Sequence, residues 1–352
     1  MQRPLAMALA ALLAACQGDP VGEAPGDGGT SDASDGGPSL WTLVYDDPKA
    51  ALDDALHDIY APSADDLWVV GKNQQILRWA GGKWDPFSQI PGAHLYGIWG
   101  ESSAALTAVG AAAFDLSPIV LDYDGGMWIS GAPFPPSLPA LTDVWGKGTQ
   151  RYFTGLAGQI FQDDPVNHPN DRYHLAVVTG GCPTGSEPSP TLNAIDGSSF
   201  ENILAAGDSA VLAHKDASGW IRLCGPDLKV SYASVFRLPG TSTFFVGANF
   251  LGLSWFLERN KPLAQVYQNL AIPEADKAYI QRITGDASQV VAVGDRGTVL
   301  YFDLKTDPRP LPSPTDDALY GVALAGSDTL YVCGRKNRVW RASLAALAAS
   351  GM

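Results

Sequence analysis

The sequence predicts an all-β protein, a seven-bladed β-propeller of four-stranded blades that is closed by an N-terminal outer strand in the last blade. The first observation is an internal repeat with a period of about 40 to 50 residues. The second is the composition of the repeats, which are rich in Val, Ile, aromatic residues and glycine and lack a 3.6-residue periodicity. The third is a spare apolar strand before the first repeat. HEAT and armadillo repeats have a similar period, but they are helical, so the composition excludes them.

Each repeat begins with an apolar opening and reaches a glycine at the end of its second strand. The first unit, LHDIYAPSADDLWVVG, runs from Leu56 to Gly71, and its opening recurs as LYGIWG, LTDVWG, LNAIDG, YASVFR, IQRITG and LYGVAL. The glycine lies 14 or 15 residues after the opening residue in all seven units. We predict that each glycine is a structural turn residue with a positive φ angle. These glycines are Gly71, Gly110, Gly155, Gly207, Gly247, Gly294 and Gly334.

The second strand of each unit is apolar on both faces. Runs such as LWVV, VVAV and LYVC leave no polar face for solvent, as expected for a sheet packed between two neighbouring sheets. Asp65 and Asp66, which precede the first run, form a carboxylate pair of the kind that performs acid–base catalysis. The positions equivalent to Asp66 in the other units hold mostly small or polar residues, so we interpret the pair as turn residues. The openings should be the innermost strands, which line the axis.

The ring is predicted to close by strand exchange. The last unit ends at Ala342 with three strands, while residues 40–47, LWTLVYDD, form a strand with no opening before it. We predict that Trp41–Tyr45 is the outer strand of the last blade, because an open ring would expose sheet edges. Deleting residues 40–46 should therefore lower stability sharply. The propeller then spans residues 40–343, followed by a C-terminal tail at 344–352.

The N-terminus has the pattern of an export signal. Residues 1–15 contain one basic residue, Arg3, and an apolar run that is too short to cross a membrane. The ending Leu13-Ala14-Ala15-Cys16 resembles the bacterial lipobox. That resemblance implies cleavage before Cys16, acylation of this cysteine and anchoring in the cell envelope. The alternative is an ordinary secretory signal that happens to end beside a cysteine.

The residue after the lipidated cysteine indicates the membrane. The inner-membrane retention signal of enteric bacteria is an aspartate at this position, and here the residue is Gln17. We therefore expect an outer-membrane lipoprotein that faces either the periplasm or the cell surface. Residues 16–39 comprise the cysteine and a Gly/Asp/Ser-rich segment, which we interpret as a flexible tether with a span of about 25 Å.

The repeats resemble those of bacterial lipoproteins with bacterial-neuraminidase-repeat or YVTN-like (WD-like) β-propellers, which carry IWG…VG…GxI…DGxxW units. The photosystem II assembly factors look like more distant relatives. The stretches DYDGGMW and KDASGWI are similar to a degraded neuraminidase Asp box. An Asp box is a folding turn, so this similarity implies no sialidase activity.

No motif for catalysis, nucleotide binding or a cofactor is present. His168 and His174 lie in an acidic loop where a metal site is conceivable, but a polar loop is the favoured interpretation, and we predict no metal and no cofactor. Cys182 and Cys224 are the favoured pair for a disulfide, and Cys333 is expected to be a buried small hydrophobe. The formal net charge of −14, without a basic run, argues against nucleic acid as a partner.

The predicted function is that of a lipid-anchored, non-enzymatic binding or assembly scaffold for an envelope protein or a glycan. Long connections between units are the places where binding residues are expected, and they should emerge on one face. They are residues 131–140, 162–190, 259–278 and 303–318. The alternative is a hydrolase or lyase that acts on surface polysaccharide. An enzyme would need several acids, or an arginine cluster, converging from different inner strands onto the axis. On those strands we expect these residues: His57, Asp58, Tyr96, Asp143, Asn193, Ser234, Arg282 and Tyr320.

Overall fold

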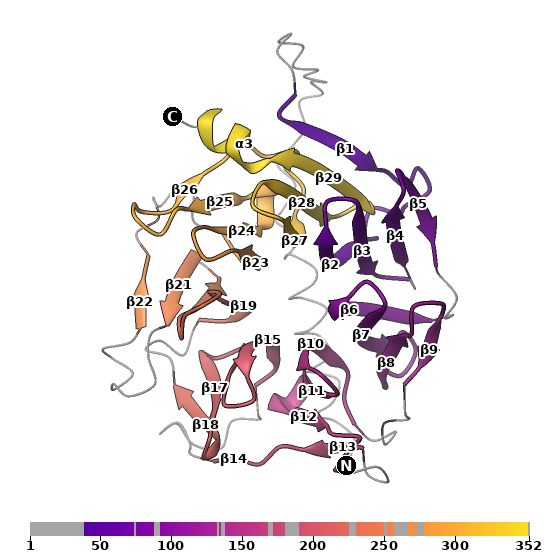
Figure 1. The fold of residues 1–352 in the computed structure, drawn as a ribbon, viewed down its shortest axis with the longest axis vertical. Helices are drawn as coiled ribbons and strands as arrows, with labels where there is room; N and C mark the ends of the chain where they lie inside the picture. Colours follow the sequence, from indigo (N-terminus) through magenta and orange to yellow (C-terminus); the bar gives the residue numbers. More distant parts are fainter. Residues whose placement is uncertain are drawn as a thin grey trace, which may run out of the picture.

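The described part of the chain is a β-propeller, in which short antiparallel sheets surround a common axis (Figure 1). The structure is a computed structural model that describes residues 39–350, except 74, 88–91, 132–133, 135–137, 168–171, 180–189, 225–229, 250–251, 257–266, 271 and 273–277. The predicted signal peptide, Cys16 and most of the tether lie outside the described residues. Among the described helices, none combines the length and the apolar character needed to cross a bilayer.

Six of the sheets have four strands; in five of them the chain moves outward from the axis strand by strand, and in the sixth the N-terminal strand β1 is the outermost. The first three are β2 (Leu56–Ser63), β3 (Asp66–Gly71), β4 (Ile76–Ala80) and β5 (Lys83–Pro86); β6 (Ala93–Ser102), β7 (Ala105–Ala112), β8 (Pro118–Tyr123) and β9 (Trp128–Ser130); and β10 (Leu141–Lys147), β11 (Gln150–Gly155), β12 (Ile160–Asp163) and β13 (Tyr173–Leu175). The other three are β19 (Tyr232–Arg237), β20 (Phe244–Ala248), β21 (Gly252–Phe256) and β22 (Tyr267–Asn269); β23 (Ile280–Gly285), β24 (Val290–Gly294), β25 (Val299–Phe302) and β26 (Arg309–Pro310); and β27 (Leu319–Ala325), β28 (Thr329–Gly334), β29 (Arg338–Ser343) and β1 (Trp41–Tyr45).

The remaining sheet departs from the predicted plan. It has five strands, in the order β14-β18-β17-β16-β15, and its extra outer strand β14 (Val178–Thr179) runs parallel to β18. The other members are β15 (Leu192–Ser199), β16 (Asn202–Gly207), β17 (Val211–Asp216) and β18 (Gly219–Cys224). The prediction of seven four-stranded blades is therefore wrong: the described residues form six blades of four strands, not seven, and the remaining sheet has five strands. The sequence repeat does not reveal β14, because this strand belongs to the chain that leaves β13 and continues along the rim.

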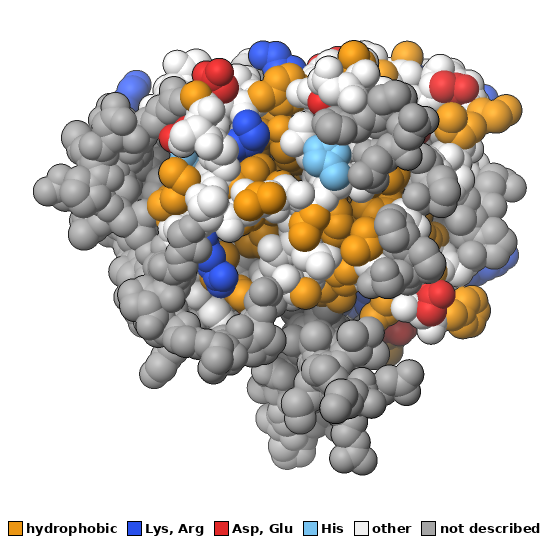
Figure 2. All heavy atoms as spheres, turned by 90° about the horizontal axis from the view of Figure 1, so that it is seen from below, with side chains coloured by type: hydrophobic (Ala, Val, Ile, Leu, Met, Phe, Trp, Pro, Cys, Tyr) orange, Lys and Arg blue, Asp and Glu red, His pale blue; other side chains and the backbone are white. Residues whose placement is uncertain are grey.

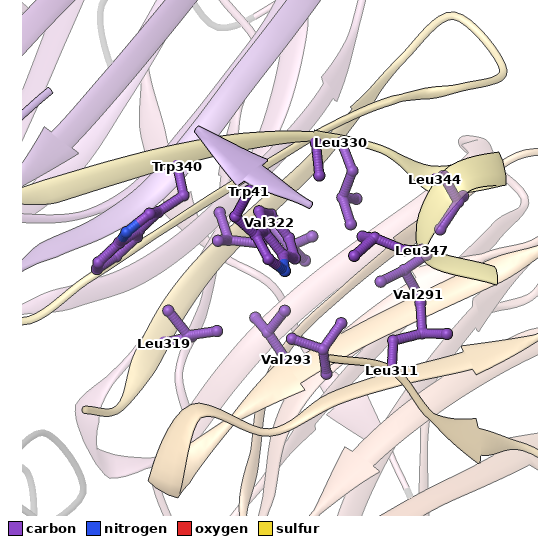
Figure 3. Packing of buried hydrophobic residues seen from close by; sticks show 13 residues of the cluster. Trp41, Val291, Val293, Leu311, Leu319, Val322, Leu330, Trp340, Leu344 and Leu347 are labelled. Carbon is purple, nitrogen blue, oxygen red and sulfur yellow. The ribbon is translucent and has the colours of Figure 1, made fainter. Parts of the chain in front are cut away.

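The predicted closure by strand exchange is confirmed. β1 pairs antiparallel with β29, with Trp41 opposite Ala342, and forms the outer strand of that sheet. The Trp41 side chain is 7% exposed, and its indole Nε1 donates a hydrogen bond to the carbonyl oxygen of Pro312 at 2.8 Å. Figure 3 shows Trp41 among the buried side chains of this region, together with Leu344 and Leu347 from α3 (Leu344–Ser350). The predicted tail thus begins with a short helix that covers the core.

The second strands are buried on both faces, as predicted. Leu67 of β3 packs in the cluster that contains Tyr331 of β28, whereas Trp68 packs in the cluster that contains Leu106 of β7. Successive residues of one strand therefore face the two neighbouring sheets. Asp66, at the start of this strand, pairs with Arg78 of β4 (Nε–Oδ1 3.2 Å), and Asp65 lies exposed in the turn. The two carboxylates have separate structural roles, as the turn interpretation requires.

The repeated glycine at or near the end of most second strands is needed for a reason other than the predicted one. None of the seven has a positive φ; Gly155 and Gly294, for example, are extended at −161° and −167°. A Cβ on Gly155 would lie 2.6 Å from the carbonyl oxygen of Ala140, the residue just before the inner strand. That carbonyl accepts a hydrogen bond from the N–H of Leu156 at 3.1 Å. The glycine therefore permits close backbone approach, and the prediction of positive φ is wrong.

Candidate binding site at the propeller axis

The inner strands present two consecutive residues near the axis because each contains a bulge. In β2, Leu56 pairs with Gly71 but Asp58 pairs with Val70, so His57 has no opposite residue. The same shift occurs near the start of β6, β10, β15, β19, β23 and β27. A bulge changes the direction of side chains in its strand. The bulged residue and the residue after it therefore form two successive levels around the axis.

Charged side chains from three inner strands meet at the second level. The guanidinium of Arg282 on β23 donates from Nε to Oδ1 of Asp58 on β2 at 3.0 Å, and its Nη2 contacts the other oxygen of Asp58. The same guanidinium donates from Nη1 and Nη2 to the two carboxylate oxygens of Asp143 on β10, both at 3.2 Å. Arg282 therefore joins strands that are far apart in sequence and neutralises one of two buried negative charges.

The axial carboxylates also have a structural task, since they accept N–H groups from the next inner strand. Oδ2 of Asp58 accepts from the N–H of Ile98 at 2.9 Å. Equivalent bonds run from Ile195 N to Asp143 Oδ2 and from Ile283 N to Ser234 Oγ, both at 3.0 Å. A similar bond, two residues further along its strands, runs from Arg237 N to Asp196 Oδ2 at 2.7 Å. We call these bonds latches. They satisfy backbone donors on the open inner edges of four sheets, those of β6, β15, β19 and β23.

Burial changes the ionisation of the axial groups. Burial raises the pKa of Asp196 to about 6, although the N–H groups of Arg237 and Gly197 oppose the change. Burial also raises the pKa of Asp58, against the opposing effect of the Arg282 guanidinium. For Arg282 burial acts to lower the pKa, but Asp143 and Asp58 together outweigh it, so the pKa is raised and the guanidinium stays charged.

Aromatic side chains form part of the first level. The ring of His57 on β2 lies between Tyr96 of β6 and Tyr320 of β27, with ring centroids 5.5 Å and 5.4 Å apart. His57 is 8% exposed, and its Nε2 is buried without a hydrogen-bond partner. Burial, followed by the charges of Lys72 and His94, lowers its pKa to about 3, so this imidazole is neutral at physiological pH.

Glycines at the second level allow neighbouring inner strands to approach one another closely. A Cβ on Gly321 would lie 2.7 Å from Sγ of Cys333 and 3.1 Å from Cα of Asp58. A Cβ on Gly97 would lie 2.8 Å from Oδ1 of Asp143. These two glycines therefore make room for the axial carboxylates and for the adjoining backbone.

Other residues of the first level are held by the turn that follows the second strand. Nδ2 of Asn193 donates to Oδ1 of Asp208 at 3.0 Å and to the carbonyl oxygen of Tyr232 at 2.9 Å. Nε2 of Gln281 donates to Oδ1 of Asp295 at 3.1 Å. Burial raises the pKa values of both aspartates. The amide side chains near the axis are thus fixed in orientation by partly buried carboxylates.

The structure brings most of the predicted inner-strand residues together at the axis. His57, Asp58, Tyr96, Asp143 and the equivalent residues of the other units lie on the inner strands, as predicted. The described residues contain no cluster of three or more metal-ligating side chains. Cys333 is buried with a free thiol, as predicted.

Two predicted features cannot be followed because they fall on residues that are not described. Cys182 and His168 lie outside the described residues, and the side chain of Cys224 is likewise not described, so the proposed disulfide remains a prediction. One axial residue was not predicted, namely Asp196. Its signal is the acid in the opening LNAIDG, where the other units place mostly an aromatic residue.

The comparisons with known proteins agree with the fold. No protein-family model matches the chain, and no curated protein matches it. Among solved structures, it is similar to YCF48 bound to D1 peptide (TM-score 0.64, 13% identity, covering 87% of this chain and 96% of that chain). It is also similar to the WD40 β-propeller domain of Doa1 (TM-score 0.64, 11% identity, 86% and 96%).

A third similar structure is an enzyme. It is a catalytically inactive variant of virginiamycin B lyase from Staphylococcus aureus with quinupristin (TM-score 0.67, 11% identity, covering 86% of this chain and 99% of that chain). At these identities the similarities establish the β-propeller fold alone, and propellers of this kind include both binding proteins and a lyase. The chain is therefore an all-β repeat protein with the β-propeller fold.

Proposed function

We propose that this protein is a lipid-anchored, non-enzymatic binding module of the bacterial cell envelope, which holds a segment of a partner protein over the axis. The proposed ligand surface is the face from which the chain enters the inner strands. Its described residues include the aromatic group of His57, Tyr96 and Tyr320 and the turns that follow the second strands.

The proposal rests on the different contacts of the acidic and the aromatic side chains at the axis. Asp58 and Asp143 are both bound by Arg282 and by N–H groups of neighbouring strands, and Asp196 accepts two backbone N–H groups. Acids that are fixed in this way support the ring and are poorly placed to transfer protons to a substrate. The aromatic group is not used in these bonds; His57 and Tyr320 are buried, and the half-buried Tyr96 is its most accessible ring.

An exposed aromatic residue extends this surface away from the axis. Phe114 lies in the turn between β7 and β8 and is 95% exposed, beside Gly92 in the chain that enters β6. Aromatic side chains are enriched among the residues that contribute most to protein–protein binding. That the similar propeller YCF48 was solved with a bound peptide supports a protein segment as the ligand.

The predicted anchor completes the proposal. Acylation at Cys16 and the segment before Ser39 would hold the propeller near the outer membrane, on its periplasmic or outer side. A Cys16→Ser variant should leave the membrane fraction and appear in the soluble fraction, as measured by fractionation and immunoblotting. An unchanged membrane association would contradict the anchor without affecting the proposed ligand surface.

In-cell crosslinking and affinity capture with the native anchor would test the binding function. The wild type should recover a defined partner, and Phe114→Ser should reduce its recovery at least about tenfold, the effect of losing a central aromatic contact. Met127→Ser is the matched control, because Met127 is 62% exposed but lies just before β9 on the rim. A partner that both variants recover equally would contradict this ligand surface.

The second candidate function is a lyase or hydrolase that acts on surface polysaccharide. It is favoured by the raised pKa of Asp196, about 6, in a fold that also supports a lyase. Turnover of an envelope polysaccharide that Asp196→Asn abolishes would establish this alternative and would contradict a purely binding function. Glycan binding without turnover would change the ligand class and leave the binding function in place.

A further inference from the structure

One stretch of the rim joins two sheets. After β13 pairs with β12, the chain continues directly into β14, which pairs in parallel with β18 of the next sheet, with Val178 opposite Trp220 and Thr179 opposite Ile221. In Figure 1, β13 and β14 form one line along the lower edge of the ring. Among the described residues, β14 is the last strand of its sheet, so its outer edge has no paired strand.

The side chains of this stretch alternate between inward and outward positions. Ala176 and Val178 point inward and pack in the cluster that contains Trp220. The outward positions hold Leu175, 54% exposed, and Val177, 80% exposed. The next outward position is Thr179, and beside it Ile221 of β18 is 37% exposed. Figure 2 shows this side of the molecule, where hydrophobic side chains gather near the centre.

The rim of another sheet provides an internal comparison. The outer strand β5 exposes Lys83 and Asp85, and charged side chains of this kind normally prevent an edge strand from pairing with another chain. The rim around β14 carries Leu175, Val177 and Ile221 in the corresponding outward positions. An apolar outward row beside an open edge lacks this protection and has the character of a docking surface.

We propose that β14 is a docking edge, to which an extended segment of a different protein adds as a further strand. The open backbone groups of β14 would bind the main chain of that segment, and Val177 and Ile221 would contact its alternate apolar side chains. This surface lies on the rim, away from the ligand surface proposed at the axis, so the two can be tested separately.

The position and charge of the chain determine the kind of segment. The described chain begins at Ser39 beside β1, on the opposite side of the ring from β14 in Figure 1. Residues 17–38 contain a single branched aliphatic residue, Val21, so they cannot supply the alternating apolar row. A second copy is disfavoured because each chain carries a formal net charge of −14. Charge complementarity therefore favours an apolar strand with basic residues at its ends.

The test uses the full-length lipidated protein in detergent and a fluorescent probe peptide in which alternating valine and threonine are flanked by lysines. Fluorescence anisotropy should show saturable binding that Val177→Lys weakens at least about tenfold. Leu52→Lys is the matched control, because Leu52 is 78% exposed and the substitution adds the same charge elsewhere on the surface. Amide exchange of residues 177–179 should slow when the peptide is added.

Each other outcome contradicts the proposal. No saturable binding, or equal weakening by the two lysine variants, would show that the edge recognises no strand. A dimer that depends on Val177 in sedimentation would make a second copy the occupant. Binding to phosphatidylcholine vesicles that depends on Val177, without peptide binding, would make a lipid surface the occupant.

Discussion

The axis of the ring is built in two different ways. The inner strands β10, β15, β19 and β23, which we call the latched sector, are joined by short polar side chains such as Asp143 and Ser234 that bond to the next strand. The inner strands β27, β2 and β6, the aromatic sector, contact one another through Tyr320, His57 and Tyr96. Among the described residues, the latch in the aromatic sector comes from Asp58.

The difference indicates which part of the axis serves stability and which part is available for recognition. Latches use the polar atoms of their side chains on the protein itself, so little remains for a ligand. The aromatic sector is held by packing and by close backbone approach at Gly97 and Gly321, and it leaves Nε2 of His57 without a partner. Arg282 is the link between the sectors, since it binds one carboxylate from each.

The largest effect is expected from removing this link. Arg282→Met should lower the free energy of unfolding by about 3–5 kcal/mol, because Asp58 and Asp143 would lose the buried guanidinium that pairs with both of them. Urea unfolding followed by fluorescence measures this loss. Arg296→Met, at an exposed turn, is the control and should change stability by about 0.5 kcal/mol or less. A similarly small loss for Arg282→Met would mean that the sectors are not coupled through this residue.

The next effect tests the close packing of the aromatic sector. Gly321→Ala should cost about 1–3 kcal/mol, because its Cβ would meet Sγ of Cys333 and the backbone of β2. Gly126→Ala is the control, since the nearest atom to its Cβ would be Oδ1 of Asp124 at 3.5 Å, an ordinary contact. Both variants are compared with the wild type in the same urea titration. Equal stabilities would show that the strands can separate without loss.

A pH profile examines the latched sector. The pKa of Asp196 is raised from 3.8 to about 6, so its ionised form opposes folding. This destabilisation is absent below about pH 3.8, grows as the pH rises to about 6 and is complete above it. Asp196→Asn removes it but also loses one acceptor, so the net change at pH 7 should be within about 1 kcal/mol. The stability of the variant relative to wild type should rise between pH 4 and pH 6.

Asp124 provides a comparison of opposite sign. The backbone N–H groups of Met127 and Gly126 lower its pKa, so its ionised form favours folding. Asp124→Asn should therefore lose stability relative to the wild type as the pH rises from the acid range. If both asparagine variants followed the same profile, the axial position of Asp196 would have no special electrostatic effect.

The smallest effect on stability is expected at His57. Phenylalanine keeps the ring between Tyr96 and Tyr320 and removes the unpaired Nε2, so His57→Phe should change the free energy of unfolding by about 1 kcal/mol or less. Thermal unfolding checks this expectation. If recovery of the partner falls while stability is kept, His57 takes part in recognition. A large loss of stability would instead assign it a structural role.

The repeat made much of the fold predictable from the sequence. Apolar openings and apolar second strands identified the inner strands and the closure by Trp41–Tyr45, because both follow from local pattern and from the need to leave no open edge. The seven glycines were located correctly, but their conformation was not. A glycine that recurs at one position of every repeat can indicate either a positive φ or a close backbone approach. None of these glycines has a positive φ, and most of them lie close to the backbone of the inner strand.

The site was predictable only as a set of residues. Arg282 lies 224 residues from Asp58 and 139 from Asp143, and their contact depends on the size and register of the ring. No local pattern carries that information. The pairing of β14 with β18 was missed for a similar reason: two residues in a parallel pair leave no alternating pattern in the sequence that would distinguish them from a loop.

The pairing of β1 with β29 has a consequence for the order of folding. The first strand of the propeller must remain without its partner until nearly the whole chain has been made, because residue 41 pairs with residue 342. Contacts of such long sequence separation form slowly. During that interval both strand edges are open to other chains, so the newly made chain is most vulnerable to aggregation before its two ends meet.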